Sequence, residues 1–502
     1  MHTIKNIMTP MQRKSLFIAF VSAMLLAACQ KPTSAAPEIN FAIAQMPLNL
    51  DPRYATDAAS ERVNRLIYQP LVDFDVASKP AWILASRSTL SGDAASDTEY
   101  RFSLIKNCAN FHNGAALTAA DVKATYDSFQ TLKDSPHAAE FANIKNIKIE
   151  ADDVVIFQLK QADRHFVEKL IIGILPKSLI EHNHDFSHNP VGNGALKFVS
   201  WQNKLLLQRV KDGQMISLTE VKDPTVRVLK LLRGEVDLLQ GDLSPELVKY
   251  LQSQPTITVK TSVGANFSYL GLNFNDPQLK ILKVRQAIAH AINRQDIIAK
   301  VTVNNTRLAD QILPPEHYTN VGKSNLKLYD YNPKLSKKLL VEAGIKLPLK
   351  LVYKTSTDAQ RVRFATIMQA QMREAGIALE IKSLDWGTFF ADVKGGNFQL
   401  FGLTWVGIKT PEIYTKAFGS ANFPPNGFNR GRYADAELDK MLADENWQMA
   451  TTRIHNELPY IPLWYEGQFT AFNKNISHYN PKPDGNWDDL AIIEKSATIS
   501  RK

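Results

Sequence analysis

The stretch SYLGLNFNDP, residues 268–277, leads into VRQAIAHAINRQDI, residues 284–297, and this pair of segments decides the fold. In the second segment apolar residues recur at positions i, i+3, i+4, i+7 and i+8, which predicts one amphipathic helix over residues 284–297. In the first segment Leu270, Leu272 and Phe274 alternate with other residues, which predicts a half-buried strand. The sequence therefore predicts a strand, a turn and a helix near the middle of the chain.

The same alternation of strand and helix signals recurs on both sides of this unit. Thr118 precedes Asp121 by three residues, the spacing of a capping box, and Asn332 before Pro333 predicts another helix start. Further strands are expected at 205–210, 349–353, 378–381 and 399–405, and further helices at 225–233 and 361–375. Alternating strands and helices predict an α/β protein.

The N-terminus has the pattern of an export signal. Lys5, Arg13 and Lys14 precede an apolar run over residues 15–28, which is too short to span a bilayer comfortably and is typical of a cleaved signal peptide. The run ends in Leu-Ala-Ala-Cys, which resembles a bacterial lipobox, so Cys29 is the predicted lipidated first residue of the mature chain. An ordinary cleavage site beside a coincidental cysteine is the alternative.

Composition narrows the class of protein. A chain of 502 residues is expected to form two or three domains. The net charge is +9, and removing the three leader cations leaves +6 without a basic cluster interleaved with aromatic residues, so nucleic-acid binding is not expected. Cys108 is the one other cysteine, which excludes a disulfide framework and favours a buried structural thiol.

Three histidines and one aspartate lie close together in the segment before residue 190. His182, His184, Asp185 and His188 have the residue types of a transition-metal site. Loops that lead into turns also collect solvated His and Asn side chains, and this interpretation is favoured. A metal site remains the alternative, and no metal or other cofactor is predicted.

Several short motifs occur in the order in which one known family has them. They are LDP at 50–52, TAADV at 118–122, GEVD at 234–237, YNP at 331–333, EAG at 342–344 and LPYIPL at 458–463. With the central strand and helix, they make the chain resemble the family 5 extracellular solute-binding proteins from about residue 39 to about residue 475. This family comprises the dipeptide- and oligopeptide-binding components of ABC importers.

The resemblance implies an α/β, bilobed periplasmic-binding-protein fold of class II, the large peptide-binding type, with an extra inserted domain. The expected domains are a signal peptide at 1–28, a lipidated tether at 29–37, lobe I at 38–69 with 188–262 and 473–497, inserted domain II at 70–187, and lobe III at 263–472. The implied function is capture of a peptide or peptide-like small solute between the lobes and its delivery to ABC permease subunits. The implied protein is a periplasmic, membrane-anchored monomer without catalytic activity.

The resemblance also places candidate ligand-binding residues. Peptide-binding members hold the α-ammonium of the ligand with an aspartate three residues after a strand-ending tryptophan; here Trp405 is followed at that spacing by Ile408, and then by Lys409. A buried ammonium without a partner is costly, so weak binding of free-amine peptides is expected unless another acid substitutes. Lys409 is expected to be solvated, with attraction of a ligand anion as the alternative. Other candidates for the cleft are Tyr269, Asn273 and Lys354.

Two other functions share the same features. An exported hydrolase could use a similar cleft, although the chain has no G-x-S-x-G or H-E-x-x-H motif. A lipoprotein that senses a ligand without transporting it would carry the same motifs, and the sequence does not separate the two. It also leaves open whether the anchor lies in the inner or the outer membrane.

Overall fold

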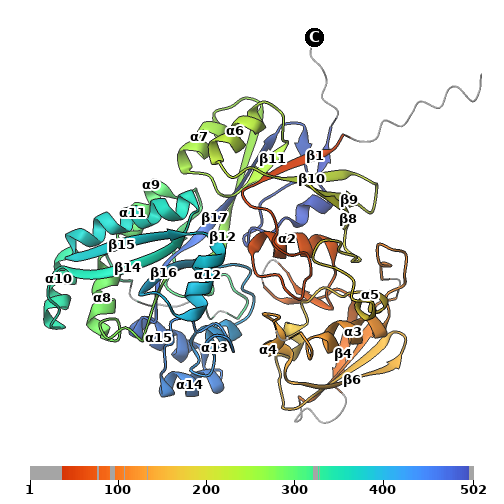
Figure 1. Ribbon diagram of the computed structural model, residues 1–502, viewed down its shortest axis with the longest axis horizontal. Coiled ribbons are helices and arrows are strands. Elements are labelled where there is room, and N and C mark those ends of the chain that lie inside the picture. Colours follow the sequence, from red (N-terminus) through yellow and green to blue (C-terminus); the bar gives the residue numbers. More distant parts are fainter. Residues whose placement is uncertain are drawn as a thin grey trace, which may run out of the picture.

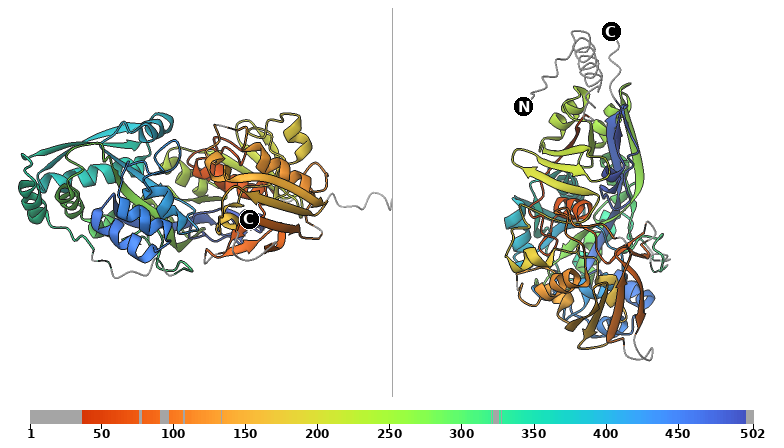
Figure 2. Two further views of the ribbon diagram at one scale, coloured as in Figure 1. Left: turned by 90° about the horizontal axis from the view of Figure 1, so that it is seen from below. Right: turned by 90° about the vertical axis from the view of Figure 1, so that its right-hand side faces the viewer.

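The computed structural model describes residues 37–496 except 76–77, 91–96, 107, 133, 320, 322–325 and 327. The predicted signal peptide, Cys29 and nearly all of the tether lie outside the described residues. The described chain forms two lobes that lie side by side along the long axis, with a smaller domain attached to one of them (Figures 1 and 2). The α/β bilobed architecture expected from the sequence is confirmed.

One mixed sheet runs through both lobes. Its strand order is β15-β14-β16-β12-β17-β11-β1-β10-β9-β8, and β13 (Arg307–Leu308) pairs with β17 beside this path. The two central strands, β12 (Ile257–Leu272) and β17 (Tyr460–Asn473), are antiparallel and pass from one lobe into the other. Each lobe is therefore built on one half of a single, continuously hydrogen-bonded sheet (Figure 1).

Lobe I is built on the half of the sheet that contains β1, with β1 parallel to both of its neighbours. Two clusters of buried apolar side chains pack here, one around Phe41 and Leu207 and one around Leu231 and Leu251. Its elements are β1 (Ile39–Ile43), α2 (Ala58–Ile67), β8 (Leu196–Trp201), β9 (Leu205–Arg209), β10 (Met215–Glu220), α6 (Pro224–Leu232), β11 (Leu238–Gln240), α7 (Pro245–Gln252) and, near the C-terminus, β18 (Ile476–Ser477), η2 (Asp488–Ala491) and β19 (Glu494–Lys495).

Domain II has a separate four-stranded antiparallel sheet, in the order β4-β5-β7-β6, and its own apolar cluster around Phe102 and Phe157. The predicted capping box starts its main helix: Asp121 accepts hydrogen bonds from the backbone and hydroxyl of Thr118. Its elements are β2 (Val72–Phe74), β3 (Pro80–Trp82), β4 (Ala85–Leu90), β5 (Glu99–Leu104), α3 (Ala119–Ser128), α4 (Ala138–Phe141), β6 (Ile144–Ala151), β7 (Val154–Leu159), η1 (Phe166–Lys169) and α5 (Lys177–Glu181).

Lobe III carries the other half of the sheet and the largest apolar cluster. The predicted start of one helix is confirmed, since the Asn332 side chain caps the helix that begins at Pro333. Its elements are α8 (Leu282–His290), α9 (Arg294–Val301), α10 (Pro333–Glu342), β14 (Leu349–Ser356), α11 (Ala359–Glu374), β15 (Ile377–Leu384), α12 (Trp386–Gly395), β16 (Leu400–Trp405), α13 (Glu412–Phe418), α14 (Ala436–Ala443) and α15 (Trp447–Glu457). The residue boundaries of the three units stay a prediction.

Two details of the central unit differ from the prediction. The single helix expected over residues 284–297 is wrong: α8 ends at His290, and Asn293 caps a second helix by accepting a hydrogen bond from the Asp296 backbone. The strand is also buried on both faces rather than on one, because Tyr269 on one face and Leu270 and Leu272 on the other all pack into the apolar cluster of lobe III. Apolar periodicity alone does not show the break between two helices that share one buried stripe.

The crossing between the lobes is tightly packed. The pairing of β12 with β17 is irregular between Ser262 and Asn266, where the strands leave one lobe for the other. A Cβ atom on Gly264 would lie 1.5 Å from the carbonyl oxygen of Glu466. Only glycine fits at this point of the crossing.

None of the helices in the described part of the chain combines the length and the apolar character needed to cross a bilayer.

Arg285 ties the start of α8 to the end of α15. Its side chain is 3% exposed, and its guanidinium donates hydrogen bonds to the carbonyl oxygens of Glu457 at 2.8 Å, Leu279 at 3.0 Å and Lys280 at 2.7 Å. Replacement by methionine keeps the apolar stem but leaves these buried carbonyls without donors. We expect Arg285→Met to lower the free energy of unfolding by about 2–4 kcal/mol.

Calorimetric unfolding of wild type and of Arg285→Met measures this loss of stability. Arg373→Met, at an exposed position of α11, serves as the matched control and is expected to change stability by less than about 0.5 kcal/mol. Equal midpoints for the two variants would contradict the role assigned to Arg285.

Candidate functional site

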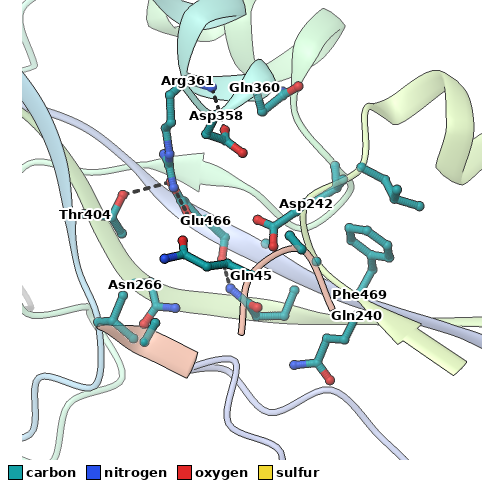
Figure 3. Close-up of a pocket in the computed structure, with 18 of the residues that line it drawn as sticks. Gln45, Gln240, Asp242, Asn266, Asp358, Gln360, Arg361, Thr404, Glu466 and Phe469 are labelled. Carbon is teal, nitrogen blue, oxygen red and sulfur yellow. Dashed lines mark hydrogen bonds and ion pairs between the residues drawn. The ribbon is translucent and has the colours of Figure 1, made fainter. Parts of the chain in front are cut away.

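A cavity of about 320 Å³ lies where the two lobes face each other. Lobe I contributes residues from the ends of β1 and β11 and from the first turns of α2, and lobe III contributes residues from β16, β17 and the start of α11. The polar residues that line it include Gln45, Gln240, Asp242, Asn266, Asp358, Gln360, Arg361, Thr404 and Glu466 (Figure 3). A cavity of this size suits a small solute.

Glu466 organises one wall of the cavity at the crossing between the lobes. Its carboxylate pairs with the Arg361 guanidinium and accepts hydrogen bonds from the hydroxyl groups of Ser268 and Thr404. Burial alone would raise the pKa of Glu466, but the Arg361 charge and the hydrogen bonds from Arg361, Ser268 and Thr404 together outweigh it and hold that pKa below its usual range. The charged groups of this wall therefore already have partners within the protein.

Two other carboxylates face the cavity from opposite lobes. Asp242 stands two residues after β11 ends at Gln240, and Asp358 stands two residues after β14 ends at Ser356. The protein that surrounds Asp242 raises its pKa by excluding water, and the negative charge of Asp358 raises it further. Neither residue was predicted from the sequence, although ligands often bind beyond the carboxyl ends of strands in α/β sheets.

Two of the predicted site residues lie together, but deeper in lobe III. Tyr269 is fully buried and stacks on Tyr460, with ring centroids 4.2 Å apart. Its hydroxyl group accepts a hydrogen bond from Arg430 at 3.1 Å, and the same guanidinium lies 4.5 Å from the ring centroid of Trp405. Neither Tyr269 nor Trp405 is among the residues that line the cavity, although Thr404 and Val406 beside Trp405 are.

The other four predicted residues are engaged within the chain. Ile408 packs against the apolar cluster of lobe III, and the Lys409 ammonium pairs with Asp484 of lobe I at 2.8 Å, so the expectation of a solvated Lys409 is wrong. The Asn273 amide donates to the carbonyl oxygens of Gly396 and Phe398, and Lys354 pairs with Asp392 at 2.6 Å. A ligand-binding role for any of the six residues stays a prediction.

The histidine segment is dispersed into separate contacts. His182 hydrogen-bonds the carbonyl oxygen of Ser178, His184 that of Asn189, and His188 the carboxylate of Asp185. Among the residues that the structure describes, no three His, Cys, Asp or Glu side chains are grouped as metal ligands. Cys108 is half-buried and lies against the apolar cluster of domain II.

Domain II and lobe III also touch, away from the cavity. Glu445 of lobe III binds His165 of domain II at 2.9 Å and the neighbouring Arg164, and Lys416 pairs with Glu140. A hydrogen bond to Glu168, with a second one to Glu445, raises the pKa of His165 to about 9. Ion pairs therefore bridge the two sides of the molecule at a distance from the candidate site.

Comparison with known proteins identifies the family to which this chain is similar. The family model described as bacterial extracellular solute-binding proteins, family 5 Middle, matches residues 82–423. The oligopeptide-binding protein AppA of Bacillus subtilis (strain 168) is 25% identical over 491 residues, which cover 88% of either chain. The glutathione-binding protein GsiB of Escherichia coli O157:H7 is 27% identical over 512 residues, which cover 94% of this chain and 97% of GsiB.

A solved structure agrees with the sequence relatives. The structure of AppA from Bacillus subtilis in complex with a nonapeptide matches with a TM-score of 0.81 at 21% identity, and the match covers 92% of this chain and 99% of that one. At this level of identity the agreement concerns the fold.

The contact of His165 gives a pH prediction. Because the folded-state pKa of about 9 lies above the ordinary value of 6.5, the protonated imidazole stabilises the folded protein fully below pH 6.5, and this contribution is lost as the pH rises to about 9. We expect His165→Gln to lower the free energy of unfolding by about 1 kcal/mol near pH 6 and to have little effect near pH 10.

Calorimetry at the two pH values measures the difference between wild type and variant. His188→Gln, which removes an exposed imidazole, is the control and should have a small effect at both. If His165→Gln lowered the free energy of unfolding equally at both pH values, the stabilisation could not come from the charge of the imidazole.

Proposed function

Since the chain belongs to the bacterial extracellular solute-binding proteins of family 5, we propose that it captures a peptide or peptide-like small solute in the cavity between its lobes and delivers it to the permease of an ABC importer. The carrying observation is that this cavity is lined from both lobes at the strands that connect them. A solute bound there contacts both halves of the sheet and favours the closed arrangement of the lobes.

Two kinds of observation support a peptide-like solute. The relatives AppA and GsiB are named for binding an oligopeptide and glutathione, which are both peptides. The cavity also offers charged groups of both signs together with amide side chains such as Gln45 and Asn266, and these groups complement the ends and the amide bonds of a short peptide.

The chain is further proposed to be a monomeric lipoprotein of the cell envelope, anchored through Cys29. The support is the sequence pattern, since a positive segment and an apolar run precede the lipobox-like residues. A lipid on the first mature residue would keep the protein near the membrane that holds the permease. Catalysis is not part of the proposed function, because members of the family bind their solutes.

Native mass spectrometry of the protein purified without denaturation tests the capture of a solute. We expect an additional mass of peptide-like composition that is lost after unfolding and refolding. Val406→Trp, which places a large ring at the wall of the cavity, should lower the occupancy at least about tenfold, whereas Val341→Trp on the exposed face of α10 should leave it unchanged. Equal occupancy in the two variants would place the solute elsewhere.

The lipid anchor has its own test. In cells fed a labelled fatty acid, the wild-type chain should carry the label and sediment with membranes, and Cys29→Ala should lose both properties. Cys108→Ala, which removes the remaining cysteine, should behave as wild type. Label retained in the Cys29→Ala chain would refute lipidation at this residue.

A further inference from the structure

Four carboxylates line the cavity, and two of them are already engaged. Asp57 caps α2 by accepting a hydrogen bond from the Ser60 backbone at 2.9 Å, and Glu466 pairs with Arg361. Asp242 and Asp358 are different: neither forms an ion pair with any residue that the structure describes. Asp358 uses one oxygen to cap α11, at 2.9 Å from the Arg361 backbone nitrogen.

The two carboxylates without an ion pair come from separate halves of the molecule. Asp242 belongs to the turn between β11 and α7 of lobe I, and Asp358 to the turn between β14 and α11 of lobe III. Figure 3 shows them on neighbouring walls of the same cavity. Two negative charges that face each other across a cleft repel, and a cation between them would replace this repulsion by two attractions.

The same cavity contains donors that lack an acceptor. Arg62 of α2 forms no ion pair within the described chain, and its buried Nε has no hydrogen-bond partner. Its guanidinium lies 5.4 Å from the ring centroid of Trp487. Trp487 and Trp464, which are 3% and 1% exposed, line the cavity, and their indole nitrogens also find no acceptor among the described residues.

A buried donor without a partner is unusual, because the lost hydrogen bond to water is not replaced. The unpaired donors of Arg62 and of the two tryptophans therefore indicate that a group with acceptor oxygens completes the cavity. These donors call for a negatively charged group of the solute, and the charge of Arg62 lies near enough to Asp242 for the two to attract each other.

The position at which the family resemblance places the ammonium of a peptide is not available here. Ile408 replaces the aspartate, and the next residue, Lys409, brings the chain's own ammonium to Asp484. A ligand ammonium must therefore find another partner, and among the described residues the cavity acids that form no direct ion pair, apart from the α2 cap Asp57, are Asp242 and Asp358.

We propose that the cavity selects a zwitterion, with an ammonium group of the solute between Asp242 and Asp358 and a carboxylate of the solute at Arg62. This assignment rests on the proposed capture of a peptide-like solute. Because the ammonium contacts one acid from each lobe, its charge joins the two lobes directly. The two aspartates and Arg62 are thus the residues that determine specificity for the charged ends.

Isothermal titration with three forms of one peptide tests the proposal: trialanine, N-acetyl-trialanine and trialanine amide. Wild type should bind trialanine at least about tenfold more tightly than either blocked form. Asp242→Asn and Asp358→Asn should each weaken trialanine about tenfold and remove the preference over the N-acetyl form. Arg62→Gln should remove the preference over the amide, and Arg62→Lys should retain part of it.

Asp444→Asn, at an exposed position after α14, is the control and should bind all three peptides as wild type does. Thermal unfolding of every variant verifies its fold. Similar affinities of wild type for all three forms, or a preference for the free amine that survives in both aspartate variants, would overturn the zwitterion assignment alone. Failure of all three forms to bind wild type up to about 1 mM would overturn it together with the peptide-like solute.

Discussion

The antiparallel pair of β12 and β17 is the constraint on which the rest of this structure depends. Both strands belong to both lobes, and their hydrogen bonds continue on either side of the crossing between Ser262 and Asn266. A change in the angle between the lobes must therefore be absorbed in this short irregular segment. The cavity lies beside the same segment: Glu466 lines the cavity and also pairs with Asn266 at the crossing. A ligand in the cavity therefore makes its contacts close to the axis about which the lobes would rotate.

The distribution of ion pairs separates the structural charges from those available to a ligand. At the contact between domain II and lobe III, Glu445 and Lys416 are satisfied by partners from the other side. In the cavity, Arg361 and Glu466 satisfy each other, while Asp242 and Asp358 form no direct ion pair with any described residue. Both aspartates are exposed to solvent in the unliganded protein, and a solute of complementary charge would replace this water on binding.

The α/β class of the fold followed from local patterns that recur along the chain, whereas the bilobed arrangement was implied by the resemblance to a known family. The caps at Thr118 and Asn332 and the apolar stripe of residues 284–292 are signals of this kind. The same periodicity failed to separate α8 from α9, since their shared stripe does not register the cap formed by Asn293.

The site was harder to predict, because it is assembled from turns that are distant in the sequence. The family resemblance predicted a site at Trp405, Ile408 and Lys409, whereas Asp242 and Asp358 become neighbours only when the two halves of the sheet are joined. A lysine near a cleft is expected to be solvated on sequence grounds alone. Its partner, Asp484, lies in the other lobe, and only the tertiary structure brings the two together.

Gly264 sets a limit on how this molecule can diverge. Any side chain at this position would collide with the backbone of the facing strand, so no substitution of Gly264 is tolerated without a shift of that strand. The turn after β14 carries no such backbone restriction at Asp358, whereas the turn after β11 holds Gly241 and Asp242 at positive φ, which few side chains adopt. Descendants of this chain can therefore vary the solute contacts at the turn after β14 while they inherit the joint between the lobes unaltered.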